Sequence, residues 1–416
     1  ILYYTCVPLI ISIQFLYLGL FEGTFLEQFL NSLFEASSAI STTGFTLLGE
    51  TILPKSLILA RAIIEWNGGI GIIFLLLSSF YPSLALSHYG KALGIEKFAG
   101  DYKVSFTVVL FIYTIYTVIF SALLILLGMD PFTALHTTLA VYSTTGLTII
   151  DVQMLPASIR VILAIIMLVS ALSFSLHLKV LSILLNADWK SLLKGRLRSF
   201  VSSLLKNGWR PILTKETKLH LILIAAFTLL YCGATKLDLF NAFLNVLSSS
   251  ASVGLSIIDF NRAGEMGKII LVMVMLIGSS SFSIGGGIRV YRLYILGKTL
   301  TKLPSIFLSG EKPKIKINDR NLELSEIIIH LLIIFLFLTF SFLASLILCS
   351  FGYSFTDALF ESVSAISTTG NMPVNLTQTA SGLHKLLLIA LMLLGRIEII
   401  PVFVAFSNEA EREQHG

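Results

Sequence analysis

The stretch AISTTGF occupies residues 39–45, and a nearly identical stretch, AISTTGN, returns at 365–371. Between them lie VYSTTGL at 141–147 and the more divergent SASVGL at 250–255. We refer to these four stretches, in chain order, as glycine motifs 1 to 4. A small, hydroxyl-rich sequence that recurs at nearly even spacing predicts one structural unit used four times.

The composition places these motifs in a membrane protein. Of the 416 residues, 55% are hydrophobic and 13% are charged, and the mean hydropathy is +0.88. A water-soluble domain of this length would not show such a composition. The net charge of +5 is unevenly distributed, which fits membrane orientation better than nucleic-acid binding. We therefore expect a multi-pass protein of the lipid bilayer that binds no nucleic acid.

Two kinds of apolar segment alternate along the chain. A helix needs about 20 apolar residues to cross a bilayer. Eight stretches meet that length or come close to it: 1–21, 57–80, 105–128, 158–185, 219–235, 267–297, 326–350 and 384–407. Four shorter stretches each lead directly into a glycine motif: 25–40, 131–142, 238–249 and 354–366. Because the shorter stretches cannot cross as helices, we expect half-length helices that enter the membrane and turn back.

The charges of the connecting segments predict an orientation. The connections at 81–104, 186–218 and 298–325 form one set, and the second of them is strongly basic. The segments around the glycine motifs are more acidic: Glu22, Glu27, Glu35, Glu50, Asp130, Asp151, Asp238, Asp259, Asp357 and Glu361. By the positive-inside rule the basic set is cytoplasmic and the motifs face the outer side. Acidic outer loops would attract cations weakly, screened within about 10 Å at physiological salt.

The predicted fold class is an all-α membrane protein. Four fused helix–pore loop–helix repeats would surround one central ion pore with pseudo-fourfold symmetry. All four copies have the same orientation, which argues against the inverted repeats of many secondary transporters. The predicted segments are repeat 1 at 1–80, repeat 2 at 105–185, a basic cytoplasmic loop at 186–218, repeat 3 with a broken inner helix and gate loop at 219–297, a cytoplasmic loop at 298–325, repeat 4 at 326–407 and a cytoplasmic tail at 408–416.

The chemistry of the glycine motifs suits a cation. Non-helical backbone at membrane depth is tolerated only where protein buries it or where it lines water. Its free carbonyl groups can replace the hydration shell of a cation. Glycine reaches positive φ without a Cβ penalty, and the threonines before it favour extended backbone and carry additional oxygens. Each half-length helix also directs its partly negative C-terminal end at the motif. Four such loops around one axis predict a cation selectivity filter.

Seven stretches together carry a resemblance to a known family. They are EASSAISTTGF at 35–45, IEWNGGIGIIFL at 64–75, TLAVYSTTGLTIID at 138–151, SSSASVGLSIIDF at 248–260, SFSIGGGIRV at 281–290, ESVSAISTTGN at 361–371 and MLLGRIEI at 392–399. With these stretches the chain resembles the Trk/Ktr/HKT superfamily of potassium transporters, and within it the pore-forming subunits of the bacterial TrkH/KtrB type. The resemblance extends over nearly the whole chain.

The resemblance implies which residues form the filter. In the family, the filter backbone comes from the residues that lead into each glycine, and potassium binds there. On this chain these residues are Thr42, Thr43, Gly44, Thr144, Thr145, Gly146, Ser252, Val253, Gly254, Thr368, Thr369 and Gly370. Family members with glycine in all four repeats favour potassium, whereas serine in the first repeat goes with sodium transport. Motif 3 departs most from the pattern, so we expect a less symmetric ring than in a tetrameric channel.

A run of small residues, GSSSFSIGGGIR at 278–289, interrupts the predicted span 267–297. Each glycine in a helix costs roughly 0.5–1 kcal/mol relative to alanine. The run is compatible with a small-residue face for close helix packing. It is also compatible with a broken helix that forms a loop below the filter. The resemblance implies the second interpretation, with an intramembrane gate formed by Gly278, Ser279, Ser280, Ser281, Gly285, Gly286 and Gly287.

Arg396 lies within the last predicted span. An arginine at membrane depth is costly and normally faces a partner or an aqueous cavity. Pairing with a buried acid, or extension toward the helix end, would satisfy it. The resemblance implies that Arg396 lies in the pore beside the gate loop and raises the barrier to cations in the closed state. Arg61 and Glu65, four residues apart, are expected to pair on one helix face.

Together these features predict potassium uptake across the cytoplasmic (inner) membrane, by channel-like permeation through the filter and past the gate loop. A symporter that couples potassium to sodium or protons is the alternative. No nucleotide-binding motif is present, so no cofactor is expected, and potassium is the substrate. The family implies a homodimer and a cytoplasmic ring of nucleotide-binding regulatory subunits of the TrkA/KtrA type, which would dock on 186–218 and 298–325. An intramembrane protease would need Ser/His or paired Asp residues within spans, so no enzyme is expected.

Overall fold

The computed structural model describes residues 2–48, 53–78, 102–185, 214–255, 260–309, 316–317, 320–322, 324–373 and 380–398. The predicted tail at 408–416 and most of the predicted basic loop at 186–218 lie outside the described residues. The described part is helical apart from one hairpin of two very short strands. The fold is therefore all-α, as the sequence predicts.

The described helices follow the predicted order of long and short elements. In chain order the elements are α1 (Leu2–Tyr17), α2 (Phe25–Ile40), α3 (Lys55–Ser78), α5 (Tyr102–Leu126), α6 (Pro131–Tyr142), the 3-10 turn η2 (Val152–Met154), α7 (Ala157–Ala171), α8 (Phe174–Leu185), α11 (Lys215–Thr235), α12 (Leu239–Ser250), the 3-10 turn η3 (Phe260–Ala263), α13 (Gly264–Ile277), α14 (Val290–Ser309), β1 (Lys316–Ile317), β2 (Arg320–Asn321), α15 (Leu324–Ser350), α16 (Phe355–Ile366) and α17 (Gly382–Ile397).

The four half-length helices α2, α6, α12 and α16 begin at the residues that the sequence marks as caps. An oxygen on the side chain before each helix accepts a hydrogen bond from a backbone N–H of the first turn. The four caps are Thr24, Asp130, Asp238 and Ser354. Thr24 and Glu27 form a complete capping box. These caps fix the start of each half-length helix, so the place where its glycine motif begins is set by local chemistry.

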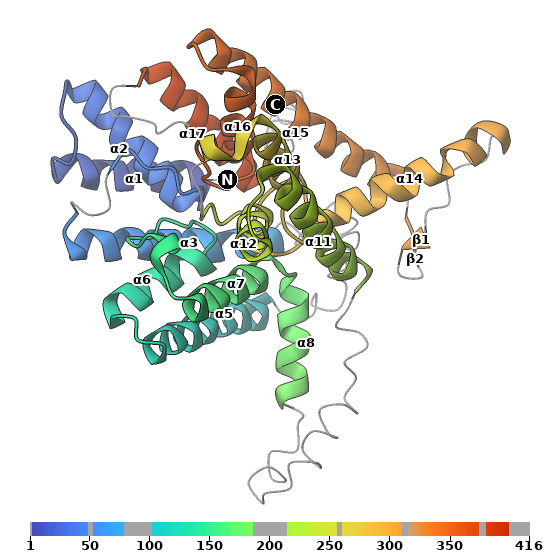
Figure 1. Cartoon of the computed structure of the whole chain (residues 1–416), viewed down its shortest axis with the longest axis horizontal. Coiled ribbons are helices and arrows are strands. Elements are labelled where there is room, and N and C mark those ends of the chain that lie inside the picture. The colour runs from blue at the N-terminus through green and yellow to red at the C-terminus, as the bar shows by residue number, and fades with distance from the viewer. Residues whose placement is uncertain are drawn as a thin grey trace, which may run out of the picture.

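The helices close into a ring of four units. In each unit the first long helix packs on the half-length helix that follows it: α1 on α2, α5 on α6, α11 on α12 and α15 on α16. The second helix of each unit packs on the half-length helix of the next unit: α3 on α6, α7 on α12, α13 on α16 and α17 on α2. Figure 1 shows these units as successive colour blocks around a common centre, with α8 and α14 projecting away from it. The last contact, α17 on α2, joins the end of the chain to its beginning.

Four described helices are long and apolar enough to cross a membrane: α3, α5, α11 and α15. The bent pair α7 and α8 raises this number to five if it counts as one span. The remaining predicted spans correspond to the shorter apolar helices α1, α13 and α17 in the described part of the chain. Large apolar side chains such as Ile119 and Phe335 face outward. These features describe a multi-pass membrane protein.

One predicted span differs from the structure. The apolar run 158–185 suggested a single continuous helix, but α7 ends at Ala171 and α8 begins at Phe174 at an angle of 103°. A backbone group at the break finds its hydrogen-bond partner in another segment, because the N–H of Phe174 donates to the carbonyl oxygen of Phe282 at 2.7 Å. Hydropathy detects the apolar run but not this tertiary hydrogen bond, so the sequence alone did not indicate the bend.

Candidate functional site

The backbone of the glycine motifs alternates between two conformations. The glycines have φ values of 88°, 70°, 78° and 86° at Gly44, Gly146, Gly254 and Gly370. The residues two positions earlier are also left-handed: Thr42 (55°), Thr144 (65°), Ser252 (56°) and Thr368 (51°). A β-branched residue in this region is strained, and such strain gathers at functional sites. The four motifs thus share one unusual backbone conformation, with left-handed residues two positions apart.

Hydrogen bonds hold this strained backbone in place. The N–H of the residue before each glycine donates back into the half-length helix, and one such bond joins Thr43 to the Ser38 carbonyl oxygen at 3.0 Å. In motifs 1, 2 and 4 the Ser and Thr hydroxyls that flank the strained residue also bond to each other. The pairs are Ser41–Thr43 at 2.7 Å, Ser143–Thr145 at 2.9 Å and Ser367–Thr369 at 2.7 Å. The recurrent S-T-T-G sequence therefore encodes a local brace.

The four motifs meet in a closed ring. A Cβ atom at Gly44 would overlap the carbonyl oxygen of Thr145 in the next motif. The same relationship joins the other glycines to the motifs that follow them: Gly146 to Val253, Gly254 to Thr369 and Gly370 back to Thr43. Eight of the twelve predicted filter residues, all except the four glycines, are at most 1% exposed. The ring therefore brings together the residues that the sequence analysis singled out.

A buried glutamate lies nine residues before the glycine in motif 1 (Glu35) and in motif 4 (Glu361). Glu35 accepts hydrogen bonds from the Thr46 hydroxyl at 2.9 Å and from the N–H of Leu47, and it pairs with Arg61 at 3.6 Å. The predicted pair of Arg61 with Glu65 is also present, at 3.6 Å. Glu361 is the equivalent of Glu35 in the fourth repeat. The expectation that Glu35 and Glu361 belong to acidic outer loops is wrong, because both residues are at most 1% exposed.

The fourth motif needs a different partner for its acid. Position 373, which corresponds to Leu47, is a proline and has no N–H to donate. Glu361 instead lies 2.9 Å from Nε2 of His384 at the start of α17. The signal for this acid was present in the sequence, since a glutamate stands at the same distance before the glycine in motifs 1 and 4. Its burial follows only from the ring.

Polar contacts also join neighbouring repeats at the outer ends of their helices. Arg160 donates to Asn241 at 3.0 Å, Lys268 to Asp357 at 2.6 Å and Lys385 to Asn31 at 2.6 Å. In each case a cation near the start of a second helix reaches the half-length helix of the next repeat. These contacts hold the half-length helices at fixed positions around the ring.

The predicted break in the third inner helix is present. α13 ends at Ile277, α14 begins at Val290, and the residues between them form a non-helical loop that we call the gate loop (278–289). Cβ atoms at Gly285 and Gly286 would crowd the carbonyl oxygens of Ala251 in motif 3 and Ser367 in motif 4. The glycines therefore allow the gate loop to lie directly against the ring. Of the two interpretations of this run, the broken helix is the one that the structure has, because residues 278–289 are not helical.

The gate loop is bound on several sides. Its Ser280 N–H donates to the Ala171 carbonyl oxygen at the α7–α8 break, at 3.0 Å. The N–H of Ser281 donates to the carboxylate of Glu216 at the start of α11. Arg396 is buried and donates to the Ile284 carbonyl oxygen at 2.9 Å. Arg396 also donates to the Gly68 carbonyl oxygen at 2.8 Å, so it connects the gate loop to α3.

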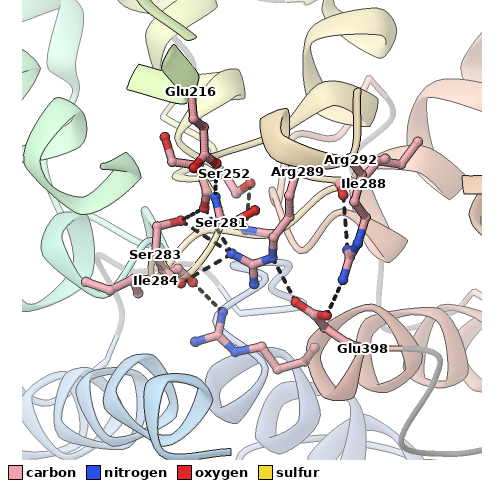
Figure 2. Close-up of polar contacts among 12 residues, drawn as sticks. Glu216, Ser252, Ser281, Ser283, Ile284, Ile288, Arg289, Arg292 and Glu398 are labelled. Atoms are coloured by element: carbon pink, nitrogen blue, oxygen red, sulfur yellow. Dashed lines mark hydrogen bonds and ion pairs between the residues drawn. The ribbon is translucent and has the colours of Figure 1, made fainter. Parts of the chain in front are cut away.

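An ion-pair cluster at the base of the gate loop was not predicted. Glu398 accepts from Arg289 at 2.8 Å and from Arg292 at 2.6 Å, and all three side chains are at most 10% exposed. Figure 2 shows the Glu398 carboxylate between the two guanidinium groups, with Arg289 directed into the gate loop. Arg289 also donates to the carbonyl oxygens of Ser280 and Ser283. The sequence signal was the pair of arginines just after the glycine run, within an otherwise apolar segment.

Comparison with known proteins identifies relatives of this chain. A family model described as "TrkH: Cation transport protein" matches residues 233–415. An uncharacterized cation transporter of Methanocaldococcus jannaschii is 26% identical over 388 residues, which cover 92% of this chain and 76% of that protein. The Trk system potassium uptake protein TrkH of Escherichia coli K12 is 26% identical over 410 residues, covering 92% and 80%. The crystal structure of the potassium transporter TrkH from Vibrio parahaemolyticus superposes with a TM-score of 0.77 at 20% identity, covering 97% of this chain and 83% of that one.

Proposed function

We propose that the chain conducts potassium into the cell through the ring of glycine motifs, because it is similar to cation transport proteins over residues 233–415 and to a potassium uptake protein over 92% of its length. The relatives named above include a potassium uptake protein that aligns with 92% of this chain. One observation of the structure carries the proposal. Each motif glycine packs on a carbonyl group of the following motif, and the fourth packs on the first.

The proposed filter consists of the carbonyl groups that lead into the four glycines. The left-handed residues two positions apart support this proposal, in which these oxygens would face one side and take the place of the water shell of a potassium ion. The half-length helices add their partly negative C-terminal ends at the same point. The residues of this filter are those predicted: Thr42–Gly44, Thr144–Gly146, Ser252–Gly254 and Thr368–Gly370.

The proposed gate is the gate loop together with Arg396. The loop lies against motifs 3 and 4, and the guanidinium group of Arg396 holds its Ile284 carbonyl oxygen. A buried positive charge next to the pathway opposes the passage of a cation. Release of the loop would remove both the obstruction and the ordered position of this charge.

The wider assembly is also part of the proposal. The protein would lie in the cytoplasmic (inner) membrane as a homodimer, with a cytoplasmic ring of nucleotide-binding regulatory subunits. Displacement of α14 and α8, which project from the ring of helices, would move the gate loop through the contacts of Arg292 and Phe174. Coupled symport with sodium or protons is the competing mechanism. A catalytic function has no support from the relatives named above, which are transporters.

Reversal potentials in planar bilayers under potassium and sodium gradients test this function. The current through the wild-type protein should reverse near the equilibrium potential of potassium. Gly44→Ser should shift the reversal toward sodium, because a side chain at this position meets the Thr145 carbonyl oxygen. Gly233→Ser is the matched control, since a Cβ atom at Gly233 in α11 has no neighbour within 4 Å. Absence of potassium current in the wild type, or a requirement for sodium or protons, would contradict channel-like permeation.

A further inference from the structure

Motif 3 lacks the local brace of the other motifs. Ala251 and Val253 stand where motifs 1, 2 and 4 have the paired Ser and Thr hydroxyls. Ser252 nevertheless has the same left-handed conformation, with φ at 56°. Its strained backbone therefore needs support from outside the motif.

The gate loop supplies that support. The N–H of Gly286 donates to the Ser252 hydroxyl at 3.1 Å, and the Ser279 hydroxyl donates to the Ser250 carbonyl oxygen at 2.9 Å. The Ser250 hydroxyl lies 3.4 Å from the Gly278 carbonyl oxygen. Figure 2 shows Ser252 beside the gate loop residues. Motif 3 is thus hydrogen-bonded to the loop at both its first and its strained residue.

A buried histidine strengthens the same connection. His220 of α11 lies between two hydroxyl groups, with Nε2 at 2.8 Å from Ser250 and Nδ1 at 3.0 Å from Ser280. All three side chains are at most 3% exposed. The histidine therefore joins the end of α12 to the gate loop at a buried site, where a polar group that loses its hydrogen-bond partner is costly.

The equivalent positions of the other motifs differ. The hydroxyl groups of Thr42, Thr144 and Thr368 are buried and have no hydrogen-bond partner among the described residues. Ser252 is the member of this set whose hydroxyl is bound by the loop. The loop also needs Gly286 for this contact, since a Cβ atom there would overlap the Ser367 carbonyl oxygen.

We propose that motif 3 couples the position of the gate loop to the ion preference of the filter, with Ser252, Ser250 and His220 as positioning residues. The inference rests on the proposed function, in which the ring is the filter and the loop is the gate. While the loop is seated, its Gly286 N–H holds Ser252 and with it the third wall of the ring. When the loop leaves, that wall relaxes and the preference for potassium over sodium falls.

A double-mutant cycle on the purified full chain, in detergent and with the loop seated, tests this coupling. The measurement is the potassium-to-sodium preference of the ring, taken as the ratio of the NaCl and KCl concentrations that half-maximally raise the thermal unfolding midpoint, for the wild type, Ser252→Ala, Gly286→Ala and the double variant. Ser252→Ala removes the acceptor hydroxyl, whereas Gly286→Ala keeps the N–H and displaces it, because the new methyl group would overlap the Ser367 carbonyl oxygen. We expect each single substitution to lower the ratio about threefold to tenfold, the effect of one lost hydrogen bond. The double variant should be no lower than the lower of the two single variants, because both break the same contact.

Thr144→Ala with Gly286→Ala is the matched cycle. Thr144 has the equivalent position in motif 2, and no hydrogen bond joins its hydroxyl to the loop in the described structure. The effects in this cycle should therefore multiply. Ser252→Thr keeps an acceptor for Gly286, so Gly286→Ala should lower the ratio in that background as much as in the wild type.

Two results would overturn the inference. One is that Ser252→Ala and Gly286→Ala multiply as Thr144→Ala and Gly286→Ala do. The other is that Ser252→Ala leaves the ratio at the wild-type value.

If Ser252→Ala does not elute as a folded protein, Ser250→Ala takes its place in the cycle with the same expectation, because it removes the hydroxyl that His220 contacts. Absence of potassium current in the wild type is a different outcome, and it would contradict the proposed function itself.

Discussion

Arg396 and Ile284 are joined by a hydrogen bond of 2.9 Å, from the guanidinium group in the last helix to a carbonyl oxygen of the gate loop. The two residues are far apart in the sequence, and both are buried. A second bond of 2.8 Å, to the Gly68 carbonyl oxygen, fixes the same guanidinium group to α3. Arg396 therefore holds the gate loop against α3, which is continuous at Gly68.

Arg396→Ala should raise the potassium flux of the protein without any regulatory subunit. Each charge-assisted hydrogen bond contributes about 1.5 kcal/mol or more, and about 1.4 kcal/mol corresponds to tenfold in an equilibrium. Loss of the bond to the gate loop should thus increase the open population, and the flux of rubidium into liposomes, by about tenfold. Arg396→Lys keeps the charge but not the two-sided geometry, so a smaller increase is expected. Unchanged flux in both variants would show that Arg396 does not hold the loop closed.

Glu398→Gln should destabilise the protein strongly. The substitution removes the carboxylate that Arg289 and Arg292 share, and these side chains are at most 10% exposed. Breaking a buried ion pair by removal of one partner costs about 3–5 kcal/mol. The free energy of unfolding in mixed detergent micelles should fall by about 3 kcal/mol.

Glu265→Gln is the control for this substitution. Glu265 pairs with Lys268 at 3.7 Å, but its side chain is 65% exposed. Exposed pairs contribute about 0–1 kcal/mol, so little change is expected. Equal effects of the two substitutions would mean that the cluster at Glu398 is not a buried ion pair of structural importance.

The half-length helices and the ring positions were predicted from the sequence because their determinants are local. Their short length and the glycine motif that follows each of them can be read directly from the sequence, and the motifs recur with the same small residues. The structure places α2 and α6 at the predicted residues. The roles of the filter and gate residues in conduction remain predictions.

Other features depend on contacts between distant segments and were not visible in the sequence. The sequence places Glu35 among acids of the outer loops, whereas in the structure it is buried and accepts a hydrogen bond from Thr46. The bend between α7 and α8 requires Phe282, which lies in another repeat. Glu398 lies two residues after Arg396 in the sequence, but its carboxylate binds arginines of α14 and of the loop before it. Hydropathy and spacing do not encode such pairings.

Asp130 predicts a pH dependence of stability. This exposed carboxylate at the start of α6 accepts hydrogen bonds from the backbone N–H groups of Phe132 and Thr133, and these bonds hold its pKa below the usual value. Because the folded state lowers the pKa, the stabilisation is present above the unfolded pKa and is lost as pH falls through the folded one. Asp130→Asn keeps a capping oxygen that does not titrate. The difference in unfolding free energy between wild type and variant should shrink as pH falls below about 4. A constant difference would contradict this role.

Gly395→Ala should destabilise the protein, although alanine favours a helix. A Cβ atom at Gly395 in α17 would overlap the Ile366 carbonyl oxygen at the end of α16, and Gly68 of α3 has the same relationship to Ile40 of α2. Since the obstacle is backbone, the helices must move apart, and overpacking of this kind costs about 1–3 kcal/mol.

Gly233→Ala in α11 has open space at the Cβ position and should stabilise by about 0.5–1 kcal/mol through helix propensity. The two variants should therefore shift the unfolding midpoint in opposite directions, and because Gly395 directly precedes Arg396, only Gly395→Ala should also raise the basal flux. Shifts of the same sign would show that α17 does not need this close approach to keep the end of α16, and the motif that follows it, in position.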